Sequence, residues 1–424
     1  MYGSKGARLV PLFLLMLARC GGAPASQPAE DPSGPTPPDA AVPADAATRD
    51  AAPATPADGS PDLGAPAPGA DAALILDAAM AADAGVVIVD APPSDPGAPA
   101  VRFVGRIDRA NPAAPRFAWS GSTILARFTG SSIGVRLAGA TNYFAVRIDG
   151  VLAPTVLTTS AGKQDYPLAA NLGAGPHELS VFRRSEARGG ETTFLGLILD
   201  PAGALLPPPP APDRRLEVIG DSTTCGYGVN GKNAGCAASP ANENYDLAYG
   251  PVAARAVGAD LITVAWRAKG MYRNFAGDMN ETMPVLYGRT LGVQPAVTWD
   301  FAAWIPDAVL INLGDNDFQK GDPGPPFVTA YTAFVKRLRG YYPQALIICG
   351  VGPKLSGTPL SRARQYVMGI VSAMNAAGDA KVDFLELPQA GPGDGFGCGG
   401  HASAATHKHM GETLAAELKT KLGW

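Results

Sequence analysis

The sequence predicts an α/β domain built on a parallel five-stranded sheet, preceded by an all-β, jelly-roll-like sandwich. Residues 214–424 alternate short apolar runs with helical patterns, residues 101–204 alternate apolar and polar positions between Gly, Asn and Pro, and a proline-rich segment spans 205–213. Continuous apolar runs are typical of parallel strands covered on both faces, whereas alternation is typical of antiparallel sandwich strands. We therefore expect two folded domains joined by a stiff proline linker.

The first 20 residues have the pattern of a signal peptide. Lys5 and Arg8 precede an apolar run at 9–17 that is too short to span a bilayer. The following Leu17-Ala-Arg-Cys20 resembles a bacterial lipobox, with Arg19 where a small residue is usual. We expect a secreted protein or an outer-membrane lipoprotein, in which lipid on Cys20 is the sole membrane contact; plain secretion is the alternative.

Residues 21–100 are expected to form a disordered, partly extended linker. They are dominated by Ala, Pro, Asp and Gly and contain no aromatic residue, so they cannot build a core. Apolar patches at 73–76 and 85–89 could form transient strands. The linker carries 12 acidic residues and one Arg, which leaves 30 basic and 26 acidic residues in 101–424. So small an excess, without clusters of Lys and Arg interleaved with aromatic residues, argues against nucleic acid as a partner.

The individual elements follow from the same patterns. Sandwich strands are expected at 122–128, 132–137, 144–148 and 177–182. The parallel strands are expected at 216–220, 260–266, 308–313, 345–350 and 382–387, with helices at 245–257, 327–341, 360–376 and 403–422 between and after them. Ligands of such sheets bind beyond the carboxyl ends of the strands.

Three strand-end or loop segments carry side chains suited to acyl transfer. Gly220-Asp-Ser222 ends the first parallel strand, Gly314-Asp-Asn316 ends the third, and Gly397-Cys-Gly-Gly-His401 precedes the last helix. Gly220 is expected to allow backbone angles that leave the Ser222 hydroxyl exposed. Serine acyl transfer needs a nucleophile, donors for the oxyanion and a base, and Ser222, Asn316 and His401 can supply them. Alone, Gly-Asp-Ser is also an ordinary turn sequence.

In the order of these segments the chain resembles the SGNH (GDSL-type) hydrolases, and more closely the second carbohydrate-esterase family of acetyl-sugar deacetylases. The resemblance covers about residues 101–424 and includes the sandwich placed before the catalytic domain. It rests on five segments: 220–228 (GDSTTCGYG), 242–249 (NENYDLAY), 269–274 (KGMYRN), 312–318 (NLGDNDF) and 397–401 (GCGGH).

The resemblance implies a role for each site residue. Ser222 would attack the ester carbonyl to form an acyl-enzyme, and His401 would take its proton and return it to the leaving sugar hydroxyl. The oxyanion would be bound by the Ser222 N–H, the Asn316 side chain and a backbone N–H in Arg267-Ala-Lys-Gly270. Family members usually have Ser-Gly-x-Gly at these positions. The resemblance therefore assigns the donor N–H to Ala268, which replaces the first glycine, and Gly270 matches the second glycine.

Two further departures from the family concern charge. The residue three before His401 is Cys398, where many SGNH enzymes have Asp, so His401 Nδ1 must meet a backbone carbonyl or a more distant acid such as Asp394. Asp315 replaces the usual Thr, and would disfavour an oxyanion unless it points to solvent or pairs with Lys269 or Arg273. The histidines at 177, 407 and 409 are weaker candidates for the base. The tryptophans at 266, 299 and 304 could stack on a sugar, but are more often core or loop anchors.

Five cysteines suit an exported protein. With Cys20 lipidated, four remain, and pairing Cys225 with Cys236 and Cys349 with Cys398 would staple two active-site loops. The sequence allows three connectivities, so this pairing is a hypothesis. A zinc site is disfavoured by the absence of a Cys-x-x-Cys element.

The function implied is removal of O-acetyl groups from an acetylated polysaccharide or oligosaccharide of the xylan or glucomannan type, without a metal or organic cofactor. Two alternatives stay open: a broad short-chain esterase, and a surface carbohydrate-binding protein on a decayed esterase fold. The first would hydrolyse acetyl and longer esters at equal rates. The second is motivated by the missing acid and by the altered 267–270 loop, and is opposed by the retained Ser222, Asn316 and His401.

Overall fold

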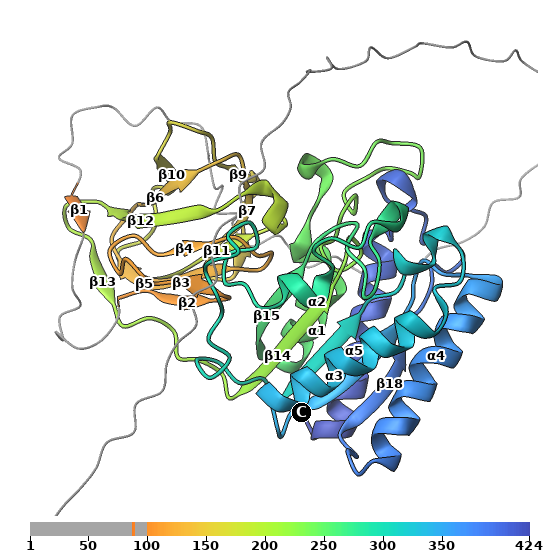
Figure 1. Cartoon of the computed structure of the whole chain (residues 1–424). Helices are drawn as coiled ribbons and strands as arrows, with labels where there is room; N and C mark the ends of the chain where they lie inside the picture. The colour runs from red at the N-terminus through yellow and green to blue at the C-terminus, as the bar shows by residue number, and fades with distance from the viewer. Residues whose placement is uncertain (1–86, 90–99) are drawn as a thin grey trace, which may run out of the picture. The chain divides into compact units, whose positions relative to one another are not determined.

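The computed structural model describes residues 87–89 and 100–424. Residues 101–206 form two antiparallel sheets, as expected of a sandwich (Figure 1). One sheet has the order β10 (Asp165–Ala169), β6 (Ile133–Gly139), β12 (Thr192–Leu199), β4 (Arg116–Phe117), β3 (Ile107–Asp108). The other has the order β13 (Ala204–Leu206), β5 (Thr123–Thr129), β11 (Pro176–Arg183), β7 (Tyr143–Ile148), β8 (Val151–Leu152), with β2 (Arg102–Val104) beside β5 and β9 (Leu157–Thr158) beside β7.

The core of the sandwich is formed by alternate residues of these strands. Phe128 and Val181 are fully buried between the sheets, while their strand neighbours are partly exposed. The expected alternation therefore reflects a sheet with one buried face.

Two short strands lie where linker was expected. Val87–Val89 forms β1, antiparallel to β12, inside the segment predicted to be disordered. Ala204–Leu206 pairs with β5, so the first residues of the proline segment belong to the sandwich. The signal peptide and the rest of the predicted linker, residues 1–86 and 90–99, lie outside the described residues.

Residues 214–424 contain the predicted parallel sheet of five strands. Its order is β15 (Ala259–Ala265), β14 (Arg214–Gly220), β16 (Ala308–Asn312), β17 (Leu346–Val351), β18 (Val382–Glu386), and every neighbouring pair is parallel. The strand order reverses at β14, between β15 and β16. The carboxyl ends of β14 and its two neighbours therefore meet at the switch point where such sheets bind ligands.

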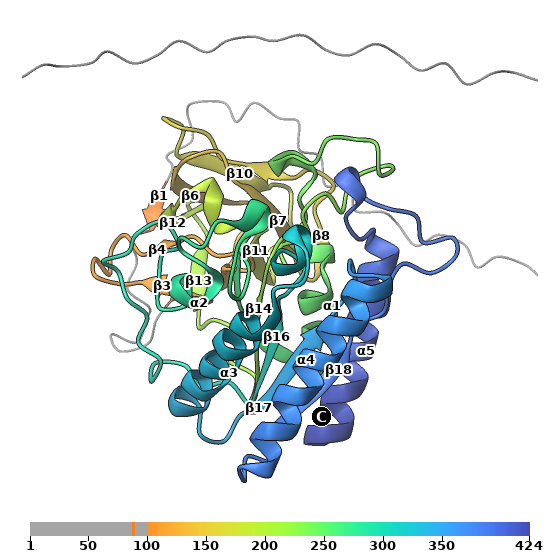
Figure 2. The ribbon, with the colours of Figure 1, turned by 45° about the vertical axis from the view of Figure 1, so that its right-hand side comes forward.

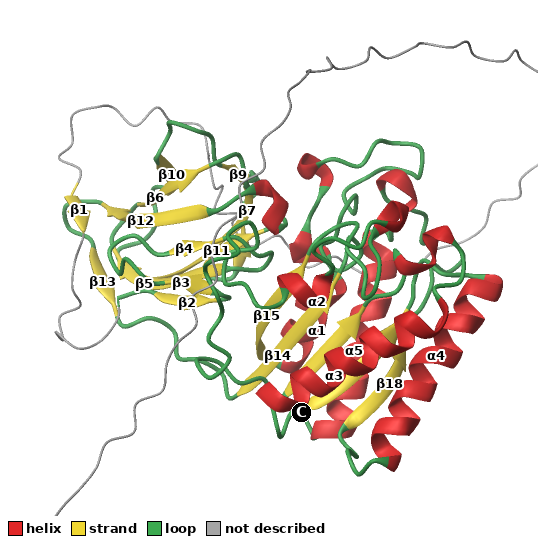
Figure 3. Cartoon of the chain, viewed as in Figure 1, coloured by secondary structure: helices red, strands yellow, loops and turns green. Residues whose placement is uncertain are grey.

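Helices cover both faces of this sheet. Ile219, Ile311 and Ile347 face a core shared with α3 (Gly324–Tyr341) and α4 (Gly357–Ala376), whereas Val218 and Leu310 face a core shared with α1 (Tyr249–Val257) and α5 (Ala404–Leu422). Figure 2 shows α3 and α4 along one side of the strands, and Figure 3 shows the loops gathered above their ends. The predicted helices are thus confirmed, with α2 (Met283–Leu286) an additional short turn.

Charged side chains of the sandwich contact the α/β domain at several places. Arg106 pairs with Glu217 of β14 at 2.9 Å, both fully buried, and Arg102 pairs with Asp260 of β15 at 2.7 Å. An unpaired charge at the first of these positions would be costly, so the pair ties the position of the sandwich to the central sheet.

Within residues 87–89 and 100–424, no helix combines the length and the apolar character that crossing a membrane requires.

Candidate active site

Ser222 lies in the tight turn that follows β14. The Asp221 side chain accepts the Thr223 N–H at 3.0 Å and the Asp221 carbonyl accepts the Cys225 N–H at 3.0 Å, so the turn is closed on both sides of Ser222. Gly220 does not adopt a positive φ; a Cβ there would lie 1.9 Å from the Thr224 Oγ1 atom. Glycine is therefore needed for space rather than for backbone freedom, which corrects the expected reason.

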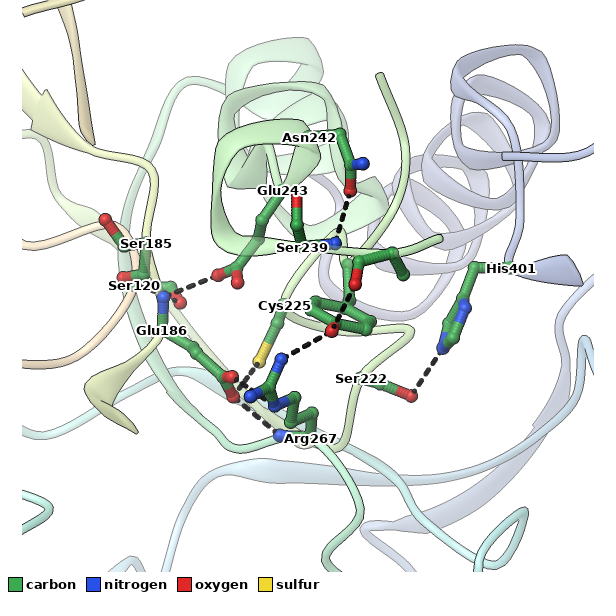
Figure 4. Close-up of polar contacts among 12 residues, drawn as sticks. Ser120, Ser185, Glu186, Ser222, Cys225, Ser239, Asn242, Glu243, Arg267 and His401 are labelled. Carbon is green, nitrogen blue, oxygen red and sulfur yellow. Dashed lines mark hydrogen bonds and ion pairs between the residues drawn. The ribbon is translucent and has the colours of Figure 1, made fainter. Parts of the chain in front are cut away.

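His401 lies directly opposite Ser222. Its Nε2 atom is 3.2 Å from Ser222 Oγ, within the reach of proton transfer (Figure 4). The histidine follows the short turn Cys398–Gly400, in which Gly399 and Gly400 have φ of 63° and 67°, and it precedes α5, which Ser403 caps. The structure thus brings together two residues that are 179 positions apart.

The other nitrogen of His401 meets a backbone carbonyl. His401 Nδ1 lies 3.1 Å from the Cys398 oxygen. Asp394 is elsewhere: its carboxylate accepts the Gly391 N–H at 2.8 Å and lies 3.4 Å from His409. Of the two expected orienting groups, the carbonyl is the one in place and Asp394 is not. A carbonyl on Nδ1 favours the tautomer with its proton there, which leaves Nε2 free to accept from Ser222.

The environment of His401 keeps the ring neutral. The pKa of His401 is lowered from 6.5 to about 4, chiefly by burial and also by the positive charge of Lys354, while the backbone acceptors of Cys398 and Gly399 oppose both effects. A neutral imidazole at pH 7 is the form that acts as a base.

The expected oxyanion donors lie around Ser222 but are not equally free. Asn316 Nδ2 donates to Asp221 Oδ2 at 3.0 Å and to the Lys269 carbonyl at 2.9 Å, so both of its N–H groups have acceptors. The Gly270 N–H donates to Asn274 Oδ1 at 3.1 Å, which makes Gly270 unsuitable. The Ser222 and Ala268 N–H groups have no acceptor within the described part of the chain.

Ala268 has a backbone conformation that usually requires glycine. Its φ is 64°, in the left-handed region, where a residue with a Cβ costs on the order of 1 kcal/mol. The turn that a family glycine would make is therefore retained without the glycine. Such a conformation persists where its surroundings determine it.

Three buried carboxyl groups belong to the loops of this site, those of Asp221, Asp315 and Asp317. Asp317 accepts the N–H groups of Met271, Tyr272 and Arg273 at 2.7–2.9 Å, a cradle that sequence reasoning missed. Asp315 is buried, and the positive charge that acts on it is that of Lys354 rather than of Lys269 or Arg273. Its burial and the charge of Asp221 raise the pKa of Asp315 well above its usual range.

A protonated Asp315 carries no charge that would oppose an oxyanion. The pKa of Asp221 is likewise raised to about 6, chiefly by burial and also by the charge of Asp317. The raised pKa of Asp315 thus favours its uncharged form, which would not oppose an oxyanion.

The disulfide differs from the predicted pairing. Cys236 is bonded to Cys398, with their Cα atoms 4.6 Å apart, whereas Cys225 and Cys349 are free and buried. The prediction of 225–236 and 349–398 pairs was therefore wrong. Cys349 lies inside β17 within the core, and Cys225 Sγ faces the Glu186 carboxylate at 3.8 Å. The bond joins the loop after the Ser222 turn to the loop that carries His401.

A polar cluster at the domain boundary was not found from the sequence. Glu186 lies between β11 and β12 of the sandwich and pairs with Arg267 at 3.0 Å (Figure 4). Arg267 donates to the Tyr227 hydroxyl at 2.5 Å, and the Tyr227 ring meets His401 edge-on with centroids 5.2 Å apart. No motif links these residues in sequence, because they come from both domains.

Two pockets are lined by loops of this site, although neither lining includes Ser222 or His401. One, of about 280 Å³, is lined by the 266–269 loop and by Arg188, Asn274, Phe275 and Asp278. The other, of about 260 Å³, includes Lys354, Phe396, Gly400 and Ala402 around the histidine loop. Trp266 thus lines a pocket, whereas Trp299 and Trp304 pack against the core as anchors.

The remaining histidines have structural surroundings. His177 lies 2.7 Å from Asp149 within the sandwich, and His407 is buried with its ring stacked on Tyr249. Within the described ranges, no group of three His, Cys, Asp or Glu side chains could hold a metal ion.

Comparisons with known proteins agree with this architecture. Residues 103–209 match the family described as Carbohydrate esterase 2 N-terminal, and residues 218–409 match the GDSL-like Lipase/Acylhydrolase family. The cellulase/esterase CelE of Acetivibrio thermocellus is 38% identical over 337 residues, which cover 79% of this chain and 41% of that relative. An acetylxylan esterase / glucomannan deacetylase of Cellvibrio japonicus is 27% identical over 331 residues, covering 77% of this chain and 90% of the relative.

Solved structures show the same similarity across both domains. A family two carbohydrate esterase from Clostridium thermocellum, solved in complex with cellohexaose, is 38% identical with a TM-score of 0.74, and the match covers 76% of this chain and 99% of that one. A carbohydrate esterase family 2 enzyme from Corynascus thermopiles is 35% identical with a TM-score of 0.68, covering 76% and 100%. This chain therefore belongs to the second family of carbohydrate esterases, with the family's N-terminal domain followed in sequence by a GDSL-like hydrolase domain.

Proposed function

We propose that this protein is a serine esterase that removes O-acetyl groups from carbohydrates of the xylan or glucomannan type. The observation that carries the proposal is the 3.2 Å contact between Ser222 Oγ and His401 Nε2, at the switch point of the sheet. Membership of the family and the names of its relatives support the substrate class. The chain spans 41% of the length of CelE, so other activities of that relative are not transferred.

The geometry supports a two-step acyl transfer. Neutral His401 accepts the Ser222 proton at Nε2 while Ser222 Oγ forms a bond to the acetyl carbonyl carbon. The proton then passes to the leaving sugar oxygen as the ester bond breaks. In the second step a water molecule gives its proton to His401, its oxygen bonds to the acyl carbon, and acetate leaves as Ser222 regains its proton.

The oxyanion of each step would be met by the free N–H groups of Ser222 and Ala268. For Asn316 to join them, the N–H that it gives to the Lys269 carbonyl must be shared with or released to the substrate. Each such donor contributes about 100- to 1000-fold in rate in other hydrolases.

The test is acetate release from acetylated xylan, acetylated glucomannan and p-nitrophenyl acetate by the protein and its Ser222→Ala variant. We expect release that falls by about 10⁴-fold or more in the variant, since the nucleophile and its base act as a unit. Release that survives the substitution would reject the role of Ser222. No release from any ester, together with saturable glycan binding in both proteins, would favour the carbohydrate-binding alternative.

Acyl-chain preference separates the specific deacetylase from a broad short-chain esterase. We expect p-nitrophenyl acetate to be hydrolysed faster than the butyrate and hexanoate esters. Equal rates across the series would favour the broad esterase.

We further propose that the protein is exported and either released or anchored to the outer membrane through lipid on Cys20. The proposal rests on the signal-peptide pattern of residues 1–20. Labelling with a radioactive fatty acid in the wild type, lost in Cys20→Ala, would support the anchor. Export of unlabelled protein into the medium would support plain secretion.

A further inference from the structure

Glu186 is a sandwich residue whose side chain is buried at the active-site loop. It follows β11, precedes the short turn Ala187–Gly189, and is 4% exposed. Its own backbone is fixed by the Glu243 side chain, which accepts the Glu186 N–H at 2.5 Å. The carboxylate therefore has a defined direction, toward the α/β domain (Figure 4).

The carboxylate makes two contacts to one residue. Glu186 Oε1 lies 3.0 Å from the Arg267 Nε atom, and Glu186 Oε2 accepts the Arg267 backbone N–H at 2.8 Å. The first contact fixes the guanidinium and the second fixes the peptide that precedes the Arg267 Cα. Burial raises the pKa of Glu186, the Arg267 N–H and charge oppose that rise, and neighbouring Glu243 has a pKa raised well above its usual range. Arg267 is the basic partner of Glu186, with which it forms the 3.0 Å ion pair.

Arg267 extends the contact to both sides of the reacting atoms. On one side it precedes Ala268, the residue with φ of 64° and an unengaged N–H. On the other side its guanidinium lies 4.7 Å from the centre of the Tyr227 ring, which packs against His401. Through Arg267, the Glu186 carboxylate is therefore linked both to the loop that contains Ala268 and to the Tyr227 ring beside His401.

We propose that Glu186 is a positioning residue of the esterase site, which holds the Ala268 N–H in the direction of the oxyanion through Arg267. The inference rests on the proposed function. It gives the sandwich a part in catalysis that does not depend on glycan binding by that domain. It also explains how alanine persists at a position that favours glycine: the Glu186 contacts determine the backbone just before it.

The contacts of β15 separate this role from general attachment of the sandwich. The strand has a sandwich contact near each end: Arg102 pairs with Asp260 at its start, and Glu186 meets Arg267 two residues after its end. Only the second contact lies next to Ala268. Arg102→Met is therefore a matched control that breaks a domain contact on the same strand without reaching the site.

The first experiment compares Glu186→Gln with Arg102→Met on p-nitrophenyl acetate. We expect Glu186→Gln to lower kcat by about tenfold to 100-fold, because small displacements of catalytic groups have effects of that size. KM should stay within about twofold in both variants, and kcat within about twofold in Arg102→Met. Equal kcat in Glu186→Gln and the wild type, or equal losses in the two variants, would overturn the proposal.

The second experiment tests the link to Ala268. In an Ala268→Gly background, Glu186→Gln should lower kcat at least threefold less than it does beside Ala268, because glycine adopts the positive φ without support. A loss of the same size in both backgrounds would overturn the link. If Glu186→Gln fails to fold, Arg267→Lys replaces it, since lysine keeps the backbone N–H and the charge but loses the guanidinium contacts.

Hydrogen exchange distinguishes failure of this inference from failure of the proposed function. The amides of residues 267–270 should exchange faster in Glu186→Gln than in the wild type, and at the wild-type rate in Arg102→Met, whether or not the protein is an esterase. Unchanged exchange in Glu186→Gln overturns the positioning role. Faster exchange in a protein whose wild type hydrolyses no ester supports the structural link and rejects the proposed function instead.

Discussion

Ser222 and His401, the proposed nucleophile and base, are held in place by different means. Ser222 lies two residues after the end of β14, whose last five residues are buried, and its turn is closed by hydrogen bonds to the Asp221 side chain and carbonyl. His401 lies between β18 and α5, in a loop that contains Gly397, Gly399 and Gly400. That loop is joined by the Cys236–Cys398 disulfide to the segment after Ser222.

The difference shows what a histidine loop without a triad acid requires. A carboxylate would orient the imidazole and stabilise its charged form strongly, whereas the neutral Cys398 carbonyl orients the ring and stabilises the charged form less. The cross-link and the carbonyl come from the same residue, so the loop that holds the ring is fixed at the point of contact. We infer that the Cys398 carbonyl orients His401 as well as a carboxylate would, but stabilises the imidazolium form less.

The strongest test of the comparison is whether the two residues act as a unit. His401→Ala should lower kcat on p-nitrophenyl acetate by about 10⁴-fold, similar to Ser222→Ala, and the double variant should be no worse than either one. The physical reason is that Ser222 without its base is a weak nucleophile. Losses that multiply in the double variant would show that the residues act independently.

The oxyanion side offers the next effect in size. Asn316→Ala should lower kcat by about 100- to 1000-fold if the carboxamide binds the oxyanion. The alternative is that Asn316 only ties Asp221 to the Lys269 carbonyl, as in the structure. In that case the midpoint of thermal unfolding would fall while kcat changed less than tenfold. Measuring kcat and the unfolding midpoint of Asn316→Ala therefore separates the two roles.

The disulfide is expected to matter for the base more than for the nucleophile. Cys236→Ser should lower the free energy of unfolding by about 2–4 kcal/mol, because it releases a long loop in the unfolded chain. It should also lower kcat by about tenfold, since the His401 loop loses its tether. Cys349→Ala is the control, because Cys349 is buried in the core without a disulfide partner; a similar kcat in both variants would contradict the role of the cross-link.

The contrast between the two regions also explains what could be predicted from the sequence. The five parallel strands and their helices were predicted because buried strands leave apolar runs of fixed length. Ser222 and Asn316 followed, since strand ends of a parallel sheet meet at one edge.

The rest of the site depends on contacts that leave no local pattern. Cys398 pairs with Cys236 because two irregular loops cross, and sequence spacing cannot show that crossing. Glu186 comes from another domain, and Asp317 lies within the 312–318 segment, which gave no sign of its backbone contacts. The strand Val87–Val89 is short and isolated among Ala and Pro, so its pairing with β12 has no signal of its own.

A smaller effect concerns the pH dependence of the base. Burial and the Lys354 charge lower the pKa of His401 to about 4, so kcat/KM should rise with pH through about 4 and be level by pH 6.5. Stability changes in the same direction. In the unfolded chain His401 has its usual pKa of 6.5, whereas in the folded protein its pKa is about 4, so between these pH values the unfolded chain binds the extra proton. The free energy of unfolding therefore falls as the pH falls from 6.5 toward 4.

Lys354→Met tests the second cause of that low pKa. Removing the positive charge should move the acid limb of kcat/KM to higher pH, with kcat at pH 7.5 nearly unchanged. Acetate release measured between pH 3.5 and 8 gives the profile. A limb that does not move would show that burial alone sets the pKa of His401.

The smallest effect is expected at Asp394, and it decides the comparison. Where a carboxylate orients the catalytic histidine, replacing it by the amide lowers kcat by about 10⁴-fold. Here Asp394 accepts the Gly391 N–H and faces His409, while the Cys398 carbonyl holds His401 Nδ1. Asp394→Asn should therefore leave kcat on p-nitrophenyl acetate within about twofold and the acid limb unmoved. A loss of even 100-fold would mean that the loop rearranges on substrate binding and that the base acquires an acid after all.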